Sequence, residues 1–203
     1  MEKITKEYEV YNFEELNQEA QEKVLDKLRQ SYLEDSWWES ELECISEDLM
    51  EKHGINVSPG EIYFSLYEDQ LYFGKGARVS NVTKFIRSIT DKKVLLAQAI
   101  AYPNWRIDDI DLDLVTTTRG DNLIEVRCNG HNYEDGDDRW EECGDILEQE
   151  LGINFGEEID KIQKEALKKL QETQDYISSE EYLKAEIKKR EMKFLEDGSI
   201  FYY

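Results

Sequence analysis

The sequence is poor in the residues that build cross-linked or metal-bound scaffolds. It holds three cysteines, two histidines and two prolines in 203 residues. The cysteines form no Cys-x-x-Cys pair and their number is odd, so we expect free, reduced thiols rather than a disulfide framework. A structural zinc site needs about four convergent ligands, which the spacing of these few residues does not indicate. We therefore expect no metal and no cofactor, and we assign no catalytic residue.

The sequence also lacks a long apolar run. The longest, VLLAQAIAY at 94–102, is interrupted by Gln98 and is far too short to span a bilayer. The first ten residues, MEKITKEYEV, have neither the basic start nor the apolar stretch of a signal peptide. These absences predict an intracellular, cytoplasmic protein.

Basic residues are scarce. There are 25 of them against 47 acidic residues, which gives a net charge of −22. Such a charge repels phosphates and anionic lipids, so it argues against direct binding of nucleic acid or membranes and favours a basic partner. The acid is also segregated: the net charge is −10 in 1–53, +3 in 54–107, −15 in 108–160 and zero in 161–203. A protein that is acidic only for solubility has no need of this segregation.

Apolar and aromatic residues are sufficient for a core. Hydrophobic residues make up 39% of the chain, with four tryptophans, twelve tyrosines and seven phenylalanines. Helical and strand-like patterns are mixed along the sequence, which predicts an α+β fold: an antiparallel sheet packed with helices, and a carboxy-terminal helical hairpin. We expect an α+β core domain at 1–153. A helical hairpin at 154–203, in which SIFYY could form a closing strand, would pack on it.

The helices are predicted from capping signals and apolar spacing. Asn12 followed by Glu15 is a capping-box pattern, and the apolar residues that follow recur every three or four positions. A second helix over 35–52 is expected to end at Gly54. Further helices are expected at 81–101, 139–151, 157–172 and 179–195, the last ended by Asp197-Gly198.

The strands are predicted from alternation and turn residues. KITKEYEV at 3–10 alternates as an opening strand, and EIYFSL and QLYF, after the Pro59-Gly60 turn, are aromatic strand candidates. RIDDIDLDLVTTT at 106–118 alternates with period two, and RGDN turns it into LIEVRCNG.

The most interpretable feature of this hairpin is the column Asp109, Asp111 and Asp113. Alternate residues of a strand share a face about 6.6–6.8 Å apart, a spacing comparable to that of successive phosphates along a nucleic-acid strand. The row is thus a candidate partner-binding surface that imitates a phosphate backbone. The alternative is the ordinary solvated outer face of an antiparallel sheet.

A second acidic stretch, GHNYEDGDDRWEEC at 130–143, follows directly. An EF-hand alignment on Gly136 puts His131 and Tyr133 where oxygen ligands are needed, so this is not an EF-hand, although a looser divalent site stays open. We interpret its carboxylates as partner-binding residues. They are Glu134, Asp135, Asp137, Asp138, Glu141 and Glu142.

Three further features leave alternatives open. Trp37, in SWWESELEC, is a candidate interface anchor, or else a core residue beside Trp38. Asp111, Asp113, Glu125 and His131 lie on or beside adjacent expected strands, so a magnesium-dependent nuclease is an alternative. Lys75, Arg78, Lys84 and Arg87 make the middle segment mildly basic, and we expect them to pair with the acidic segments.

Four stretches together resemble a diffuse family of small proteins encoded by phages and prophages. They are YNFEELNQEAQEKVLDKLRQ, IYFSLYEDQLYFGKG, IEVRCNGHNYED and EEYLKAEIKKREMKFLEDGSIF. The family pattern falls on Phe13, Glu15, Leu16 and Asn17, then Phe64 to Gly76, then Phe194, Asp197 and Gly198. The family's Gln-Gly-Asp-Gly turn is replaced here by YEDQLYFGKG. Most of the family has no assigned activity, and the resemblance implies a mobile-element setting in which small acidic proteins disable host defence, type II anti-CRISPR proteins among them.

Charge and resemblance together lead to one functional hypothesis. We expect a non-enzymatic, phage- or prophage-encoded inhibitor that occupies the DNA- or RNA-binding surface of a basic host protein, such as a CRISPR effector nuclease. The alternatives are a metal-dependent nuclease or other enzyme acting on nucleic acid, and an antitoxin-like or regulatory partner protein.

Overall fold

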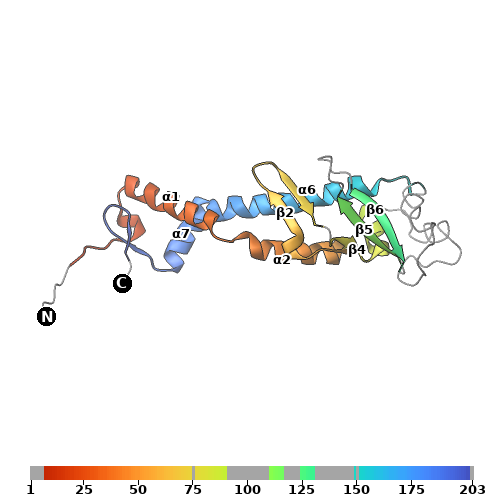
Figure 1. Cartoon of the computed structure of the whole chain (residues 1–203). Coiled ribbons are helices and arrows are strands. Elements are labelled where there is room, and N and C mark those ends of the chain that lie inside the picture. The colour runs from red at the N-terminus through yellow and green to blue at the C-terminus, as the bar shows by residue number, and fades with distance from the viewer. Residues whose placement is uncertain are drawn as a thin grey trace, which may run out of the picture. The chain divides into compact units, whose positions relative to one another are not determined.

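A computed structural model of the chain provides the fold (Figure 1). For residues 110–116 and 124–130 it describes the backbone. The described residues are 7–74, 76–90, 110–116, 124–130, 149 and 151–201.

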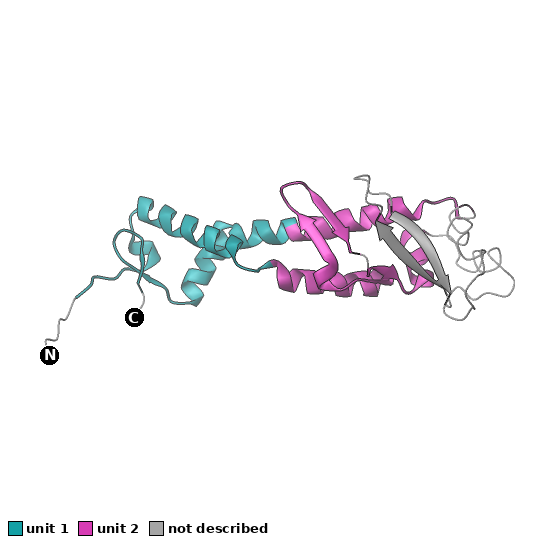
Figure 2. Cartoon of the chain, in the orientation of Figure 1, with its two compact units in different colours: residues 1–37, 171–203 teal, residues 38–170 magenta. Residues whose placement is uncertain are grey.

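The chain forms two compact units (Figure 2). Unit 1 combines residues 1–37 with 171–203, and unit 2 comprises 38–170. Helix α6, Phe155–Ser178, contributes to both units, because the boundary falls inside it. The sequence-based boundary between 153 and 154 lies just before this helix, and that division into domains stays a prediction.

Unit 1 is mainly helical. Its elements are a 3₁₀ turn η1 (Phe13–Glu15), α1 (Gln18–Glu34), the end of α6, α7 (Glu180–Lys189), β7 (Lys193–Phe194) and β8 (Ile200–Phe201).

Two asparagines control the start of α1. The Asn12 N–H donates to Oε2 of Glu15 at 2.6 Å, as the capping-box pattern predicts, but this box closes only η1. Asn17 provides the second cap, since its Oδ1 accepts the Ala20 N–H at 2.9 Å, and α1 follows it. The helix thus begins later than predicted. Of the expected opening strand, residues 7–10 are described and are not in a strand, and 3–6 lie outside the described residues.

The apolar face of α1 forms the core of unit 1. The predicted spacing is confirmed, because Ala20, Val24, Leu25 and Leu28 of α1 are buried, and α7 and β7 complete the cluster. Helix α7 therefore packs on α1, and Ser179, its N-cap, follows the end of α6 directly. The buried residues are Phe13, Leu16, Ala20, Val24, Leu25, Leu28, Leu183, Ile187 and Phe194.

The prediction that the last helix continues to Leu195 is wrong. It ends at Lys189, and Glu191 follows in the left-handed region with φ 50°. The chain then forms the antiparallel β7–β8 hairpin, whose turn contains Gly198 at φ 84°. The Asp197-Gly198 pair is therefore a hairpin turn and not a helix end, and SIFYY does contain a closing strand, β8.

Unit 2 combines helices with two antiparallel sheets. The larger sheet has the order β1-β4-β5-β6, and β2 and β3 form a separate hairpin. The elements are α2 (Trp38–Asp48), a π-helix η2 (Leu49–His53), β1 (Ile55–Asn56), a 3₁₀ turn η3 (Pro59–Glu61), β2 (Ile62–Ser65), β3 (Gln70–Phe73), β4 (Arg78–Val79), α3 (Val82–Ile89), β5 (Ile110–Thr116), β6 (Ile124–Gly130) and the first part of α6.

These elements confirm the α+β class. The four strands that the sequence placed around Pro59-Gly60 and RGDN are present as β2, β3, β5 and β6. Helix α3 occupies the start of the helix expected at 81–101, whose residues 91–101 lie outside the described residues. Most of the helix expected at 139–151 lies outside them too.

The core of unit 2 joins α2, the sheet, α3 and α6. Phe85 of α3 and Phe155 of α6 are fully buried, and their rings meet edge to face with centroids 5.4 Å apart. Ile45 of α2 and Leu49 of η2 are buried as well. This core fixes η2 beside α3, which is where the polar groups of the unit gather.

Candidate functional site

The aspartate row lies partly in β5. Asp111 and Asp113 belong to this strand, and Asp109 lies outside the described residues. In the backbone register, Asp111 is opposite Asn129 and Asp113 is opposite Arg127 of β6. On the other side of β5, Asp113 is opposite Arg78 of β4. The register therefore sets Asp113 between two arginine positions, Arg78 of β4 and Arg127 of β6.

The register also assigns the row to one face of the sheet. Val79 of β4 is fully buried and pairs with Leu112, whereas the neighbouring Arg78 is exposed and pairs with Asp113. Directly opposite residues of antiparallel strands share a face. The aspartates thus belong to the face of the exposed Arg78, opposite the face of the buried Val79.

The structure does not describe the other acidic residues that the sequence predicted for partner binding. Glu134, Asp135, Asp137, Asp138, Glu141 and Glu142 lie outside the described residues. So does His131, the fourth member of the nuclease quartet, while Glu125 is opposite Val115 on the aspartate face. Among the residues that the structure does describe, no group of three or more His, Cys, Asp or Glu side chains is placed to hold a metal ion.

Trp37 lies in the turn after α1, and Trp38 is the first residue of α2. Both side chains are half-buried. The Trp37 N–H donates to the Asp35 carbonyl at 2.8 Å in the turn after α1, and the Trp38 ring packs on Phe64 of β2 with centroids 6.3 Å apart. Trp38 thereby attaches the β2–β3 hairpin to α2. The role of Trp37 as an anchor stays a prediction.

An acidic row that the sequence analysis did not single out runs along α2. Glu39, Glu43 and Glu47 are spaced by four residues, so their side chains follow one another about 6 Å apart along the helix. All three are exposed, and none is in an ion pair with a residue of the described part of the chain. We call these three residues the α2 stripe. The spacing of four is legible in the sequence and could have revealed it.

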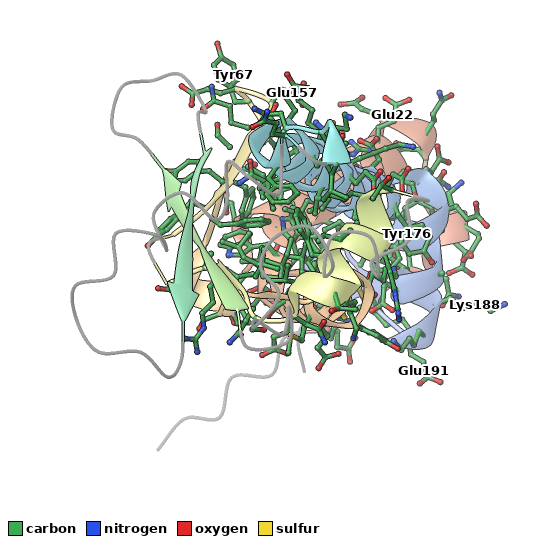
Figure 3. All side chains as sticks on the ribbon, turned by 90° about the vertical axis from the view of Figure 1, so that its right-hand side faces the viewer. Glu22, Tyr67, Glu157, Tyr176, Lys188 and Glu191 are labelled. Carbon is green, nitrogen blue, oxygen red and sulfur yellow. The ribbon has the colours of Figure 1, made fainter. Side chains whose placement is uncertain are left out.

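The β2–β3 hairpin, which belongs to unit 2 as α2 does, carries three exposed tyrosines. Tyr63 and Tyr72 are opposite each other in the register and their rings stack with centroids 5.3 Å apart, each about half exposed. Tyr67 in the connecting turn is 99% exposed and points away from the ribbon (Figure 3). Amphipathic aromatic side chains that stay exposed are typical of protein-binding surfaces. We call these three residues the tyrosine hairpin.

A single thiol lies beside the α2 stripe. Cys44 is a free, exposed cysteine next to Glu43, as the sequence predicts. The side chains of Cys128 and Cys143 lie outside what the structure describes. Cys44 therefore offers a natural position for a reporter group on this surface.

A polar cluster connects α2 and η2 with α6. The Asp48 carboxylate accepts hydrogen bonds from Lys169 and, at 2.9 Å, from Lys52. These two ammonium groups, Lys169 first, lower the pKa of Asp48. The cluster borders a cavity of about 80 Å³ whose lining also includes His53 and Glu165.

His53 is held by a serine of α3. Its Nδ1 lies 2.8 Å from Oγ of Ser88, and that hydroxyl donates to the Phe85 carbonyl at 2.7 Å. A hydroxyl has one proton, so with both bonds formed Oγ accepts from an Nδ1–H, which places a proton on Nδ1. Burial lowers the pKa of His53, in agreement with a neutral ring. π-helical turns such as η2 are frequent at functional sites.

The comparisons with known proteins add no relative. No family model, no curated protein and no solved structure matches the chain. No helix in the described ranges is long and apolar enough to cross a membrane.

Proposed function

We propose that the protein is a phage- or prophage-encoded acidic inhibitor of a host nucleic-acid-handling defence protein, of the anti-CRISPR kind. It acts by protein–protein contact, occupying a basic DNA- or RNA-binding surface of its target, such as a CRISPR effector nuclease. The resemblance to phage and prophage proteins supports the setting, and the charge of −22 supports the chemistry of the partner.

One observation carries the proposal: the exposed carboxylates of the α2 stripe stand in a regular row, and none of them is in an ion pair within the described part of the chain. The α2 stripe repeats every 6 Å or so along a helix, and the expected row Asp109, Asp111 and Asp113 repeats about every 6.7 Å along a strand. Acidic residues elsewhere in the described chain are often paired, as Glu19 is with Lys23 and Asp160 with Lys164. Carboxylate rows of this spacing match a surface that binds phosphates.

The tyrosine hairpin supplies what charge alone does not. Carboxylates at an exposed rim steer association and fix orientation, but they add little net affinity. Exposed tyrosines supply contact area at low entropic cost, and their rings bind the guanidinium groups that fill nucleic-acid channels. The hairpin and the stripe belong to the same unit, where Phe64 packs on Trp38.

The test is affinity capture from a bacterial lysate treated with nuclease, with elution by rising salt. Three baits are compared: the natural chain, the stripe variant Glu39→Lys/Glu43→Lys/Glu47→Lys, and the control variant Glu22→Lys/Glu191→Lys/Glu196→Lys. Both variants change the charge equally, and all six positions are exposed. We expect the natural and control baits to retain a basic nucleic-acid enzyme that moderate salt releases, and the stripe variant to lose it by at least tenfold.

Inhibition of the captured enzyme then decides the mechanism. The natural chain should block DNA or RNA binding by that enzyme at one-to-one stoichiometry, without turnover. Equal capture by all three baits, and by an Asp109→Lys/Asp111→Lys/Asp113→Lys variant, would refute the acidic decoy. Turnover at sub-stoichiometric amounts would instead identify an enzyme, and retention of a small co-encoded protein an antitoxin-like partner.

A further inference from the structure

The most unusual pocket in this acidic chain is lined by bases. It is an open hollow of about 330 Å³ where η2 meets α3 in unit 2. Three of its six lining side chains are cationic, the other three are neutral and polar, and no carboxylate is among them. They are Lys52, Asn81, Thr83, Lys84, Arg87 and Ser88. In a chain with nearly two acids for every base, this composition needs a physical reason.

Helical spacing and one glycine bring these residues together. Lys84 and Arg87 are three positions apart on α3, and Ser88 follows Lys84 by four, so they lie on adjacent parts of one surface. Lys52 comes from η2, which reaches α3 through Gly54. The Gly54 carbonyl accepts the N–H groups of Ser80 at 2.9 Å and Asn81 at 3.2 Å. A Cβ on Gly54 would lie 2.6 Å from the Asn81 carbonyl oxygen, so only glycine allows this approach.

The positive charges of the pocket are not fully neutralised by ion pairs within the described part of the chain. Lys84 Nζ makes one hydrogen bond, to the neutral Met50 carbonyl at 3.4 Å. Arg87 is exposed and is in no ion pair with a residue that the structure describes. Lys52 binds Asp48, but Asp48 is shared with Lys169, which leaves two ammonium groups to one carboxylate. The internal pairing expected for Lys84 and Arg87 is thus not found in the described part of the chain.

The neutral side chains shape the site. Asn81 caps α3, since its Oδ1 accepts the Lys84 N–H at 2.9 Å. The Ser88 hydroxyl donates its proton to Phe85 and is fixed by His53. Asn81 and Ser88 thus hold α3 in place, and the positive charge of the pocket comes from Lys52, Lys84 and Arg87.

We propose that this pocket binds a phosphate group, either as inorganic phosphate or as the phosphomonoester of a small molecule. The planar guanidinium of Arg87 matches two phosphate oxygens, and Lys52 and Lys84 supply point charges on either side. No aromatic side chain lines the pocket, so a nucleoside base would find no ring to stack on. The proposal is independent of the inhibitor function, because it requires no protein partner.

The test is titration of the ¹⁵N-labelled chain with inorganic phosphate at pH 7.5, with sodium chloride adjusted to constant ionic strength. Amide shifts of residues 81–88 should change and saturate. The variant Lys84→Gln/Arg87→Gln should bind at least tenfold more weakly, and the conservative variant Lys84→Arg should keep binding. The matched control Lys27→Gln/Lys188→Gln removes two exposed lysines of unit 1 and should leave the titration unchanged.

The outcomes separate the site from general charge effects. Shifts that do not saturate, or that chloride alone reproduces, would overturn the proposal, as would equal affinity in the double Gln variant. Titration with adenosine monophosphate distinguishes the source of the phosphate. If adenosine monophosphate and inorganic phosphate bind with equal affinity and the amide shifts are confined to the pocket, the site recognises the phosphate group alone. Tighter binding of adenosine monophosphate with additional amide shifts indicates that the ligand is a phosphomonoester. Both results support the site.

Discussion

His53 shows how one side chain reports on its surroundings. It is half-buried, it is bonded to Ser88, and burial lowers its pKa, an effect to which the nearby Lys52 adds while Glu165 opposes it. Free histidine has a pKa of about 6.5. A second proton, on Nε2, would charge the ring in a partly desolvated position, and this is why burial lowers the pKa.

The first prediction concerns this pKa. We expect an NMR titration of the His53 ring protons to give a pKa below 6.5, with the resonance assigned by its loss in His53→Gln. The folded chain binds the proton less well than the unfolded chain, so the contribution of His53 to the free energy of unfolding is complete above pH 6.5 and is lost as the pH falls through the folded pKa. A pKa at or above 6.5 would contradict the neutral, Ser88-bound ring.

The lowered pKa of His53 can also be checked through the pH dependence of the free energy of unfolding. Between pH 7.5 and 5, the natural chain should lose more of its free energy of unfolding than His53→Gln does. The comparison cancels the titration of the many carboxylates and of His131, which both chains share. Loss of equal size in the two chains would mean that His53 titrates alike in the folded and unfolded states.

At the scale of elements, Gly54 connects η2 to α3. It has φ 68°, it ends the helical segment as the sequence predicts, and its N–H bonds back to the Leu49 and Met50 carbonyls. Its backbone also approaches Asn81 too closely for a side chain. Position 54 therefore requires glycine for two independent reasons: the positive φ and the lack of space for a Cβ.

The second prediction compares two glycines. Gly54→Ala should lower the free energy of unfolding by at least about 1 kcal/mol, because alanine is strained at positive φ and its Cβ would clash with Asn81. Gly60→Ala is the control, since nothing lies within 4 Å of a Cβ built there. Its effect should be neutral or stabilising by less than about 1 kcal/mol. Urea denaturation measures both, and similar losses would show that Gly54 tolerates a side chain.

Local patterns predicted the elements better than the places where elements meet. The apolar spacing of α1 and the glycine after η2 are properties of short segments, so the sequence alone was sufficient for them. Asp197-Gly198 fits both a helix end and a hairpin turn, and only the pairing of β7 with β8 decides between them. Gln163 is polar but buried on the inner face of α6, which no apolar pattern indicates.

The candidate sites follow the same division. The α2 stripe is a spacing within one helix and is legible in the sequence, but it is less conspicuous than the denser acids after residue 108. The basic pocket joins Lys52 to a helix about thirty residues later. Because that neighbourhood depends on Gly54 and on the packing of Phe85 against Phe155, charge counting assigned Lys84 and Arg87 to internal pairing instead.

At the scale of the whole molecule, the net charge of −22 opposes folding. Like charges held close in the folded state repel one another, and salt screens this repulsion over about 10 Å at 0.1 M. In the unfolded chain the charges are farther apart, so salt lowers their repulsion less than it does in the folded chain. The folded protein should therefore gain stability where most salt-bridged proteins gain little.

The third prediction is that Tm rises when potassium chloride is increased from 20 to 500 mM. A gain of roughly 1 kcal/mol corresponds to an increase of about 2–4 °C for a chain of this size. The stripe variant, with three Glu→Lys changes, has a net charge of −16 and should respond less. A Tm that is constant or falls with salt in the natural chain would show that its acids are compensated internally. Calorimetry in a phosphate-free buffer keeps this measurement separate from the proposed pocket.

Unit 1 has a consequence for the order in which the chain is made. Its amino-terminal helix is buried by residues such as Leu183 and Phe194, which leave the ribosome about 150 residues after it. Because synthesis proceeds at 5–20 residues per second, the apolar face of α1 stays exposed for roughly 10–30 s before the residues that bury it are made. Unit 2, being contiguous in sequence, can be complete before unit 1 has received its second half. During that interval a nascent chain exposes Leu25 and Leu28 to chaperones, until Leu183, Ile187 and Phe194 cover them.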